Sequence, residues 1–237
     1  MKFTVCIPMY NESKIIADTA KTLSLYMSEN FDDYELIFSN DGSTDGSADI
    51  VKALGLPNVR VVGYSDNRGK GSAVRTAMLA ADGDAVMFTD SDLAYGTDVI
   101  KRVADAFAQN PDCDLVVGSR NIGKDGYDGY TFVRKIASKI YLKVLKVIGG
   151  LKISDSQCGC KAFSGAAAKR IFSHCEVDRF AFDFEAILIA GKCGYKIKEI
   201  PVKVINHGDS KVSVLRDSFK MIRDIMKMKK RISKLDI

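Results

Sequence analysis

The 237-residue sequence has only two histidines, and it has no apolar run close to the roughly 18 residues that a membrane-spanning helix requires. His174 and His207 cannot form a metal cluster by themselves, and we assign neither a catalytic role. The N-terminus lacks the charged and then apolar pattern of a secretory leader, and the six cysteines are scattered, several of them in apolar runs. We therefore expect a cytoplasmic protein with reduced thiols, whose contact with a membrane is peripheral.

The nucleotide-binding signatures of several enzyme classes are also missing. Arg68-Gly69-Lys70-Gly71 is a short glycine-rich loop, but it lacks Walker spacing and does not occupy the first strand-to-helix turn. Neither an ATPase nor a Rossmann oxidoreductase is therefore favoured. No glycine-rich, arginine-containing loop follows the first predicted strand, which disfavours a nucleotidyltransferase. The aromatic platform of single-strand binding proteins is absent too, so we expect no nucleic-acid partner.

What the sequence does contain is a regular alternation of strand and helix patterns. Apolar runs such as residues 4–7 suit strands that are covered on both faces, which predicts an α/β fold with a mostly parallel central sheet flanked by helices. The predicted strands are 3–7, 34–38, 59–62, 85–88, 159–163 and 197–204. Three helices are predicted to begin near residues 14, 47 and 71. A further helix is predicted to end near residue 149, and another is predicted over 182–193.

Polar residues gather directly after these strands, in the segments 8–12, 39–43, 64–70 and 89–92. Because ligands bind outside the carboxyl ends of parallel strands, we expect the four loops to meet at one edge of the sheet. Asp90 and Asp92 follow the fourth strand, and their spacing lets both carboxylates reach one ion. An isolated Asp-x-Asp would be a solvated turn, but the neighbouring loops favour a site for Mg²⁺ or Mn²⁺ shared with phosphates.

The Asn40–Ser47 segment combines a turn with the start of a helix. Ser47, or Thr44 before it, is the type of residue that caps a helix N-terminus. That arrangement would leave Asp41 free to accept hydrogen bonds from a base or a ribose, whereas Asp45 is expected to have a purely structural role.

Four segments together resemble the inverting family-two glycosyltransferases with a GT-A fold: residues 5–12, 40–43, 67–71 and 90–92. Residues 116–120 and 155–161 resemble more specifically the polyprenyl-phosphate branch, that is, the dolichyl-phosphate glucosyltransferases and their prokaryotic relatives. The similarity covers roughly residues 3 to 212. It implies a GT-A domain over 1–212, with a nucleotide-sugar-binding half over 1–120 and an acceptor-binding half over 121–212.

The resemblance also implies roles for individual residues on the donor side. Asp90 and Asp92 would hold the metal and the diphosphate. Related mannosyltransferases carry a glutamine two residues past the second aspartate, whereas this chain has Ala94, which favours UDP-glucose over GDP-mannose. The remaining residues expected to contact the nucleotide sugar are Pro8, Tyr10, Glu12, Asp41, Lys70, Lys161 and Lys211.

On the acceptor side, Arg120, Arg134 and Ser138 match positions that hold a lipid phosphate in the related enzymes. Arg134 and Ser138 are four residues apart and so share a helical face, although Arg134 fits equally well as a solvated member of a basic helix. Asp183 would contact sugar hydroxyls, or its negative charge would simply stabilise the N-terminus of its helix through the helix dipole. Asp155 and Gln157 would orient the sugar or Lys161; these assignments rest on the resemblance alone.

The last predicted unit, residues 213–237, is a basic amphipathic helix. Clustered lysines favour anionic lipid headgroups by about 1 kcal/mol each, so this helix is the stronger candidate for contact with a membrane surface. The helix near 132–148 shows a similar pattern, which fits a core-facing helix equally well.

The expected reaction is transfer of a hexose, with inversion, to a polyprenyl or dolichyl phosphate. A phosphate monoester is already ionised near neutral pH, so it needs no catalytic base. The alternatives are GDP-mannose or another nucleotide sugar as donor, and a glycan or a glycerolipid as acceptor. With a sugar hydroxyl as acceptor a base would be required, and Asp183 is the candidate.

Overall fold

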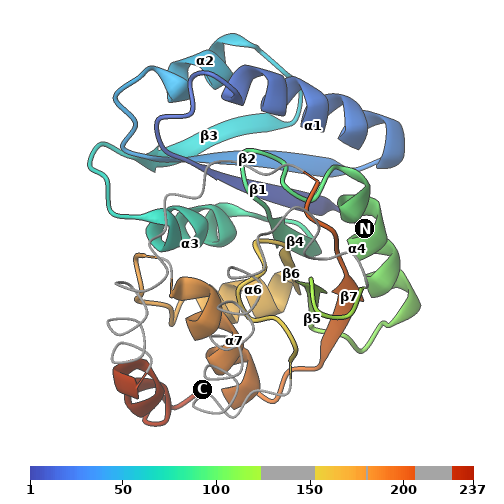
Figure 1. Ribbon diagram of the computed structural model, residues 1–237, viewed down its shortest axis with the longest axis vertical. Helices are drawn as coiled ribbons and strands as arrows, with labels where there is room; N and C mark the ends of the chain where they lie inside the picture. Colours follow the sequence, from blue (N-terminus) through green and yellow to red (C-terminus); the bar gives the residue numbers. More distant parts are fainter. Residues whose placement is uncertain (124–152, 180, 206–225) are drawn as a thin grey trace, which may run out of the picture.

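The computed structural model describes residues 1–123, 153–179, 181–205 and 226–237 (Figure 1). Within them the chain forms a seven-stranded sheet with the order β3-β2-β1-β4-β6-β5-β7. β6 runs antiparallel to both of its neighbours, and all the other adjacent strands are parallel. The strands are β1 (Phe3–Met9), β2 (Tyr34–Asp41), β3 (Val59–Tyr64), β4 (Ala85–Phe88), β5 (Leu115–Ser119), β6 (Lys161–Ser164) and β7 (Ile197–Pro201).

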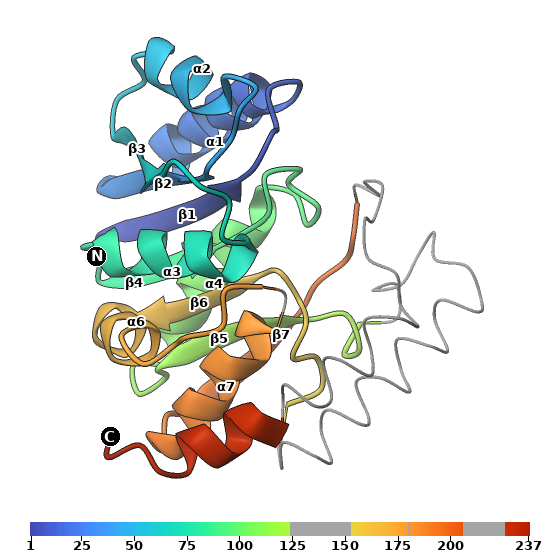
Figure 2. The same ribbon diagram turned by 90° about the vertical axis from the view of Figure 1, so that its left-hand side faces the viewer.

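Helices cover both faces of this sheet, and Figure 2 shows β1 and β2 lying between α1 and α3. Alternate residues of β1 enter different halves of the core: Val5 and Ile7 pack with α1, whereas Cys6 packs with α3. This explains the continuous apolar run, because each strand residue has a helix on its own side. The helices are α1 (Ile16–Asn30), α2 (Ser47–Ala53), α3 (Lys70–Ala80), α4 (Asp98–Gln109), α6 (Gly165–Phe172) and α7 (Phe182–Lys192).

The predicted alternation and the mostly parallel sheet are confirmed. The reversed direction of β6 was not predicted, and it has a consequence for the site. Lys161 at the start of β6 pairs with Phe88 at the end of β4, so the segment that enters β6 arrives at the same edge as the loops that leave the parallel strands.

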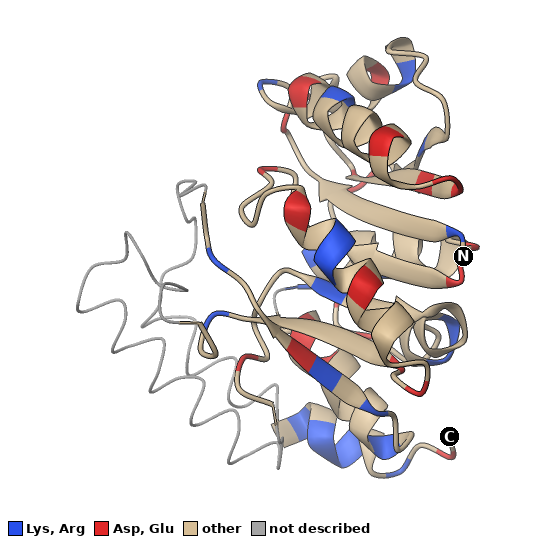
Figure 3. Cartoon of the chain, turned by 90° about the vertical axis from the view of Figure 1, so that its right-hand side faces the viewer, with Lys and Arg blue, Asp and Glu red and all other residues tan. Residues whose placement is uncertain are grey.

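Only the end of the helix predicted over 213–237 lies within the described residues. Residues 226–232 are helical, and Met228 and Ile232 are buried in the same core cluster as α6 and α7. The apolar side of this stretch therefore packs on the protein rather than facing outward. Its lysines point away from that contact, and Figure 3 shows their positive charge along the helix. In the ranges that are described, no helix combines the length and apolar character needed to cross a bilayer.

Candidate active site

The loops that follow β1 and β2 are bonded directly to each other. The backbone N–H of Asn11 donates to Ser43 Oγ at 3.0 Å, and the N–H of Thr44 donates to Asn11 Oδ1 at 2.9 Å. The N–H of Glu12 donates to Ser47 Oγ at 2.9 Å. The structure thus brings these two predicted loops together at the carboxyl edge of the sheet, as expected. Pro8 lies buried at the end of β1, and Tyr10 beyond it is 42% exposed.

The predicted cap of α2 is wrong. The N-cap is Gly46, with φ of 83° and no side-chain capping bond, and Ser47 is the first helical residue. The hydroxyl of Ser47 instead donates to Asp45 while accepting from Glu12. Asp45 also accepts the N–H of Ser13 at 2.9 Å, and the hydrogen bond from Ser47 is the largest of the effects that lower the pKa of Asp45. Asp45 and Ser47 therefore join two loops, which fits the structural role expected for Asp45.

Asp41 is not free to accept hydrogen bonds, contrary to the prediction. It is 3% exposed, and its carboxylate is surrounded by donors from the loop that follows β3. These donors are Tyr64 Oη at 2.7 Å, Asn67 Nδ2 at 2.9 Å, and the backbone N–H groups of Arg68 at 2.9 Å and Gly69 at 3.0 Å. In this structure Asp41 organises the loop that leads into α3, and contact with a nucleoside would require some of these bonds to be exchanged.

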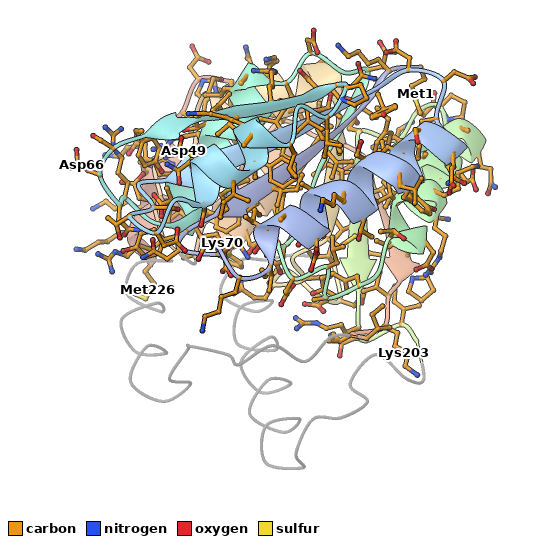
Figure 4. The ribbon with its side chains drawn as sticks, turned by 90° about the horizontal axis from the view of Figure 1, so that it is seen from above. Met1, Asp49, Asp66, Lys70, Lys203 and Met226 are labelled. Carbon is orange, nitrogen blue, oxygen red and sulfur yellow. The ribbon has the colours of Figure 1, made fainter. Side chains whose placement is uncertain are left out.

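The turn after β4 carries Asp90 and Asp92 and is fixed from several sides. Lys70, the first residue of α3, forms an ion pair with Asp90 (Figure 4 labels Lys70). Thr19 of α1 donates its hydroxyl to the carbonyl of Ser91 at 2.7 Å. The N–H of Ala94, the residue that stands in place of a glutamine, donates to Asp92 Oδ1 at 3.0 Å. The side chains of Lys70 and Asp90 each keep more than a quarter of their surface exposed, so a ligand can reach both of them from solvent.

The charges in this turn fit a divalent cation. Burial and the neighbouring charge of Asp90 raise the pKa of Asp92, so one more positive charge would stabilise the ionised pair. Partial burial works against the charge on Lys70, but the carboxylates of Asp90 and Asp183 outweigh it and raise the pKa of the ammonium. Within the described ranges, no three His, Cys, Asp or Glu side chains gather as a complete metal site would require. Phosphate or water oxygens would have to complete the shell around the two carboxylates.

Lys161 is not placed to neutralise donor phosphate, and that prediction is corrected. Its side chain is completely buried, and its ammonium donates to Asp183 Oδ1 at 2.7 Å and to the carbonyl of Cys158 at 2.5 Å. Asp183 lies in the first turn of α7 and is 7% exposed. Burial raises the pKa of Asp183, and the positive charge of Lys161 opposes that rise. Lys161 thus acts beneath the site, where it holds Asp183 in place.

Arg120 at the end of β5 is paired with Asp155 rather than standing alone. Its guanidinium donates to the two carboxylate oxygens at 2.7 and 3.0 Å, in a bidentate arrangement. Asp155 is completely buried, and although burial works in the opposite direction, the guanidinium lowers its pKa. Asp155 was expected to orient the sugar or Lys161, and it orients Arg120 instead. The side chain of Arg120 keeps 14% of its surface exposed, and its contact with an acceptor phosphate stays a prediction.

Residues 4–172 match the family model for glycosyl transferase family 2. The chain belongs to this family. It is 31% identical to a dolichyl-phosphate β-glucosyltransferase of Dictyostelium discoideum over 244 residues, which are 96% of this chain and 74% of that one. It is 28% identical to the dolichyl-phosphate β-glucosyltransferase of Saccharomyces cerevisiae over 242 residues, covering 94% and 72%.

Solved structures confirm the expected fold of this family-2 glycosyltransferase. Mannosyl-3-phosphoglycerate synthase from Rubrobacter xylanophilus aligns over 100% of this chain and 76% of its own, with a TM-score of 0.71 and 15% identity. Glucosyl-3-phosphoglycerate synthase from Mycobacterium tuberculosis, in complex with Mn²⁺, UDP-glucose and phosphoglyceric acid, aligns over 99% and 81%, with a TM-score of 0.68 and 21% identity. The GT-A expectation is thereby confirmed.

Two features of this family-2 site were missed by the sequence analysis. Gly159 lies against Asp90: a Cβ atom at position 159 would be 2.4 Å from Asp90 Oδ2. Its N–H donates to the buried Tyr95 Oη at 3.2 Å, which fixes it there. Thr19 was missed as well, since a threonine inside a predicted helix gives no signal of its bond to the Asp90–Asp92 turn. For Gly159, the only available signal was its place in residues 155–161, the segment that resembles the polyprenyl-phosphate branch.

The structure describes only some of the remaining predicted site residues. Gln157 has a buried amide nitrogen, Nε2, for which the described residues provide no hydrogen-bond partner. Glu12 is half-buried at the edge formed by the first two loops. Arg134, Ser138 and Lys211 lie outside the described residues, as do the helix predicted near 132–148 and the boundary predicted between 212 and 213.

Proposed function

We propose that this family-2 glycosyltransferase transfers glucose from UDP-glucose, with inversion, to a dolichyl-type polyprenyl phosphate. The observation that carries the proposal is the Lys70–Asp90 ion pair beside Asp92, at the edge where the donor-side loops meet. Such a cluster suits a diphosphate and its metal ion. The relatives named dolichyl-phosphate β-glucosyltransferase support the choice of sugar and acceptor, since the alignments span nearly the whole chain.

Asp90 and Asp92 would hold Mg²⁺ or Mn²⁺ against the donor diphosphate, where the ion neutralises the charge of the leaving group. Lys70 adds a second positive charge at the same point, because its ammonium already contacts Asp90. α3 begins at this lysine, so the helix N-terminus also favours a phosphate there. Tyr10, Pro8, Glu12 and Asp41 would contact the nucleoside at the adjoining edge, with the loop bonds of Asp41 exchanged on binding.

In the proposed step, an oxygen of the lipid phosphate attacks the anomeric carbon opposite the nucleotide. The new carbon–oxygen bond forms as the bond to UDP breaks, which converts an α-linked donor into a β-linked product. The attacking phosphate is already ionised, so no side chain has to remove a proton. Asp183, held by Lys161, would orient sugar hydroxyls, and Arg120 would receive the acceptor phosphate with its exposed edge.

A second candidate is transfer from GDP-mannose or another nucleotide sugar, or to the hydroxyl of a glycan or glycerolipid. Hydroxyl acceptors need a general base, and Asp183 is the candidate, because burial raises the pKa of its carboxyl group. The bidentate guanidinium of Arg120 near the site favours an anionic acceptor instead.

Because the proposed acceptor is a lipid, we also propose that the protein works at the cytoplasmic face of a membrane as a peripheral enzyme. The described C-terminal helix supports this through its exposed charges rather than its apolar side, which the core occupies. Lysine side chains near an anionic leaflet contribute about 1 kcal/mol each. The exposed lysines of this stretch are Lys227, Lys229, Lys230 and Lys234.

An acceptor and donor screen tests the proposal. The protein is incubated with Mn²⁺ or Mg²⁺, dolichyl phosphate in detergent, and radiolabelled UDP-glucose, UDP-galactose or GDP-mannose in turn. We expect lipid-linked label from UDP-glucose only, and we expect it to disappear when a chelator removes the metal. Product from GDP-mannose alone would favour the second candidate, and no lipid product from any donor would overturn the function.

A further inference from the structure

The loop between α6 and α7, residues 174–179, lies directly against the start of α3; we call it the clamp loop. A Cβ atom on Gly69 would be 2.5 Å from the carbonyl oxygen of Asp178, and one on Gly71 would be 2.4 Å from that of Val177. The N–H of Ser72 also donates to the Asp178 carbonyl at 3.2 Å. The backbone on either side of Lys70 therefore follows the position of the clamp loop.

Two arginines hold the clamp loop from opposite directions. Arg75 of α3 donates to Asp178 Oδ1 at 2.6 Å and to the carbonyl of Cys175 at 3.3 Å. Arg231, from the C-terminal helix, donates to the carbonyl of His174 at 3.0 Å. Its guanidinium also forms ion pairs with Glu176, at 2.9 Å, and with Glu185. The C-terminal helix is thus bonded to the loop that touches the phosphate-binding end of α3.

The link runs partly through a buried carboxylate. Glu185 of α7 is 0% exposed, and its Oε2 accepts the N–H groups of Glu176 at 3.0 Å and Val177 at 2.9 Å, while Oε1 faces Arg231. Burial raises the pKa of Glu185, and the two N–H donors and the guanidinium oppose that rise. A carboxylate at this depth is stable only with such partners, so removing Arg231 would disturb the two residues that Glu185 holds.

We infer that Arg231 is a positioning residue for the donor diphosphate, acting through Glu185 and the clamp loop on Gly69, Lys70 and Gly71. The inference rests on the proposed function in one respect, namely that the α3 N-terminus receives the diphosphate. It assigns a role in donor binding to the far C-terminal end of the chain, which lies outside the stretch that matches the family model.

The test compares Arg231→Met with Arg170→Met, which removes an exposed guanidinium from neighbouring α6. We expect Arg231→Met to raise the KM for UDP-glucose about tenfold, at the low end of coupling between linked sites, with the KM for dolichyl phosphate unchanged and kcat altered less than about twofold. A purely structural effect would instead lower the active fraction, reducing apparent kcat while leaving both KM values as they are. Arg170→Met should match the wild type.

Binding of UDP in the presence of Mn²⁺, measured by calorimetry, separates this inference from the reaction. If the wild-type protein binds UDP but makes no lipid-linked glucose, the proposed acceptor chemistry is wrong. The inference is then tested by UDP affinity alone, which should fall about tenfold in Arg231→Met. Arg231→Lys keeps one charge but cannot span both glutamates, and should recover part of that affinity. Folded Arg231→Met with wild-type UDP affinity would overturn the inference, as would a wild type that binds no UDP.

If Arg231→Met does not fold, Glu176→Gln takes its place. The Glu176 side chain is 70% exposed, so this change removes only the surface arm of the bridge and leaves Glu185 paired. We expect a smaller rise in the KM for UDP-glucose, about twofold to threefold, with the acceptor KM unchanged. Hydrogen exchange at residues 69–75 should quicken in the same variant. Unchanged donor KM and unchanged exchange would count against the link.

Discussion

Gly159 lies so close to Asp90 that adding one methyl group at position 159 should displace the Asp90 carboxylate. In Gly159→Ala the added methyl carbon would start 2.4 Å from Asp90 Oδ2 and 3.2 Å from its Cγ, whereas ordinary contact begins near 3.4 Å. Gly159 cannot retreat easily, because its N–H is bonded to the buried Tyr95. Asp90 is partly exposed and can rotate, so we expect the carboxylate to move by about 1 Å.

The movement should affect catalysis more than stability. A misplacement of about 1 Å at a reacting centre lowers kcat/KM by about 100-fold, or roughly 2.7 kcal/mol of transition-state stabilisation. Overpacking costs about 1–3 kcal/mol of folding free energy, which for a chain of this size lowers Tm by roughly 2–12 °C. Lys70 would move with its partner, so the Mn²⁺ concentration needed for half-maximal activity should rise as well.

The assay measures initial rates of lipid-linked glucose formation against UDP-glucose at several Mn²⁺ concentrations, with Tm taken by differential scanning fluorimetry. Gly191→Ala in α7 is the matched control, because no atom lies within 4 Å of its Cβ position. Alanine is favoured over glycine inside a helix by about 1 kcal/mol, so the control should gain stability at unchanged activity. A Gly159→Ala enzyme with wild-type kcat/KM and metal dependence would refute the reasoning.

Three further predictions follow from the site and the surface. Asp92→Asn should abolish turnover with an unchanged circular dichroism spectrum, and full activity would remove the metal assignment. Asp155→Asn should lose about 3 kcal/mol in urea unfolding near neutral pH, because Arg120 is left without its buried partner. The pKa of Asp155 is lowered in the folded state, so wild-type stability should fall as pH drops below the unfolded value of about 3.9, and the variant should lose less over that range. Lys227→Gln with Lys230→Gln should weaken binding to anionic vesicles about 30-fold, at about 1 kcal/mol each, and equal binding would exclude the charge-based contact.

The features that sequence predicted well are those set by local pattern. Apolar runs such as that of β1 predict strands covered on both faces, and polar residues after β1, β2 and β4 predict loops that meet at one edge of the sheet. Both follow from the side-chain period and the parallel pairing, which need no knowledge of distant partners. The Asp90–Asp92 turn belongs to this group, since its position after β4 was enough to place it.

The errors concern side chains whose partners are far away in the chain. Ser47 resembles a helix cap, but the neighbouring loop supplies a donor that bonds its hydroxyl instead. Asp41 looks available until the loop after β3 folds over it. Lys161 was expected to bind donor phosphate, but its side chain is buried and forms an ion pair with Asp183 of α7. In each case tertiary contacts override a local preference that is real but small.

The antiparallel direction of β6 ties the start of this strand to the edge that carries Asp90 and Asp92. Val117 of β5 pairs with Lys161 of β6, so the chain leaves and re-enters the sheet at neighbouring points. Both ends of the intervening stretch are therefore held at the sheet, and its last residues stay at the Asp90–Asp92 turn, where Gly159 lies against Asp90. A change of length just before Lys161 would shift Gly159 against Asp90, so the sequence next to β6 is expected to be constrained by the site as well as by the sheet.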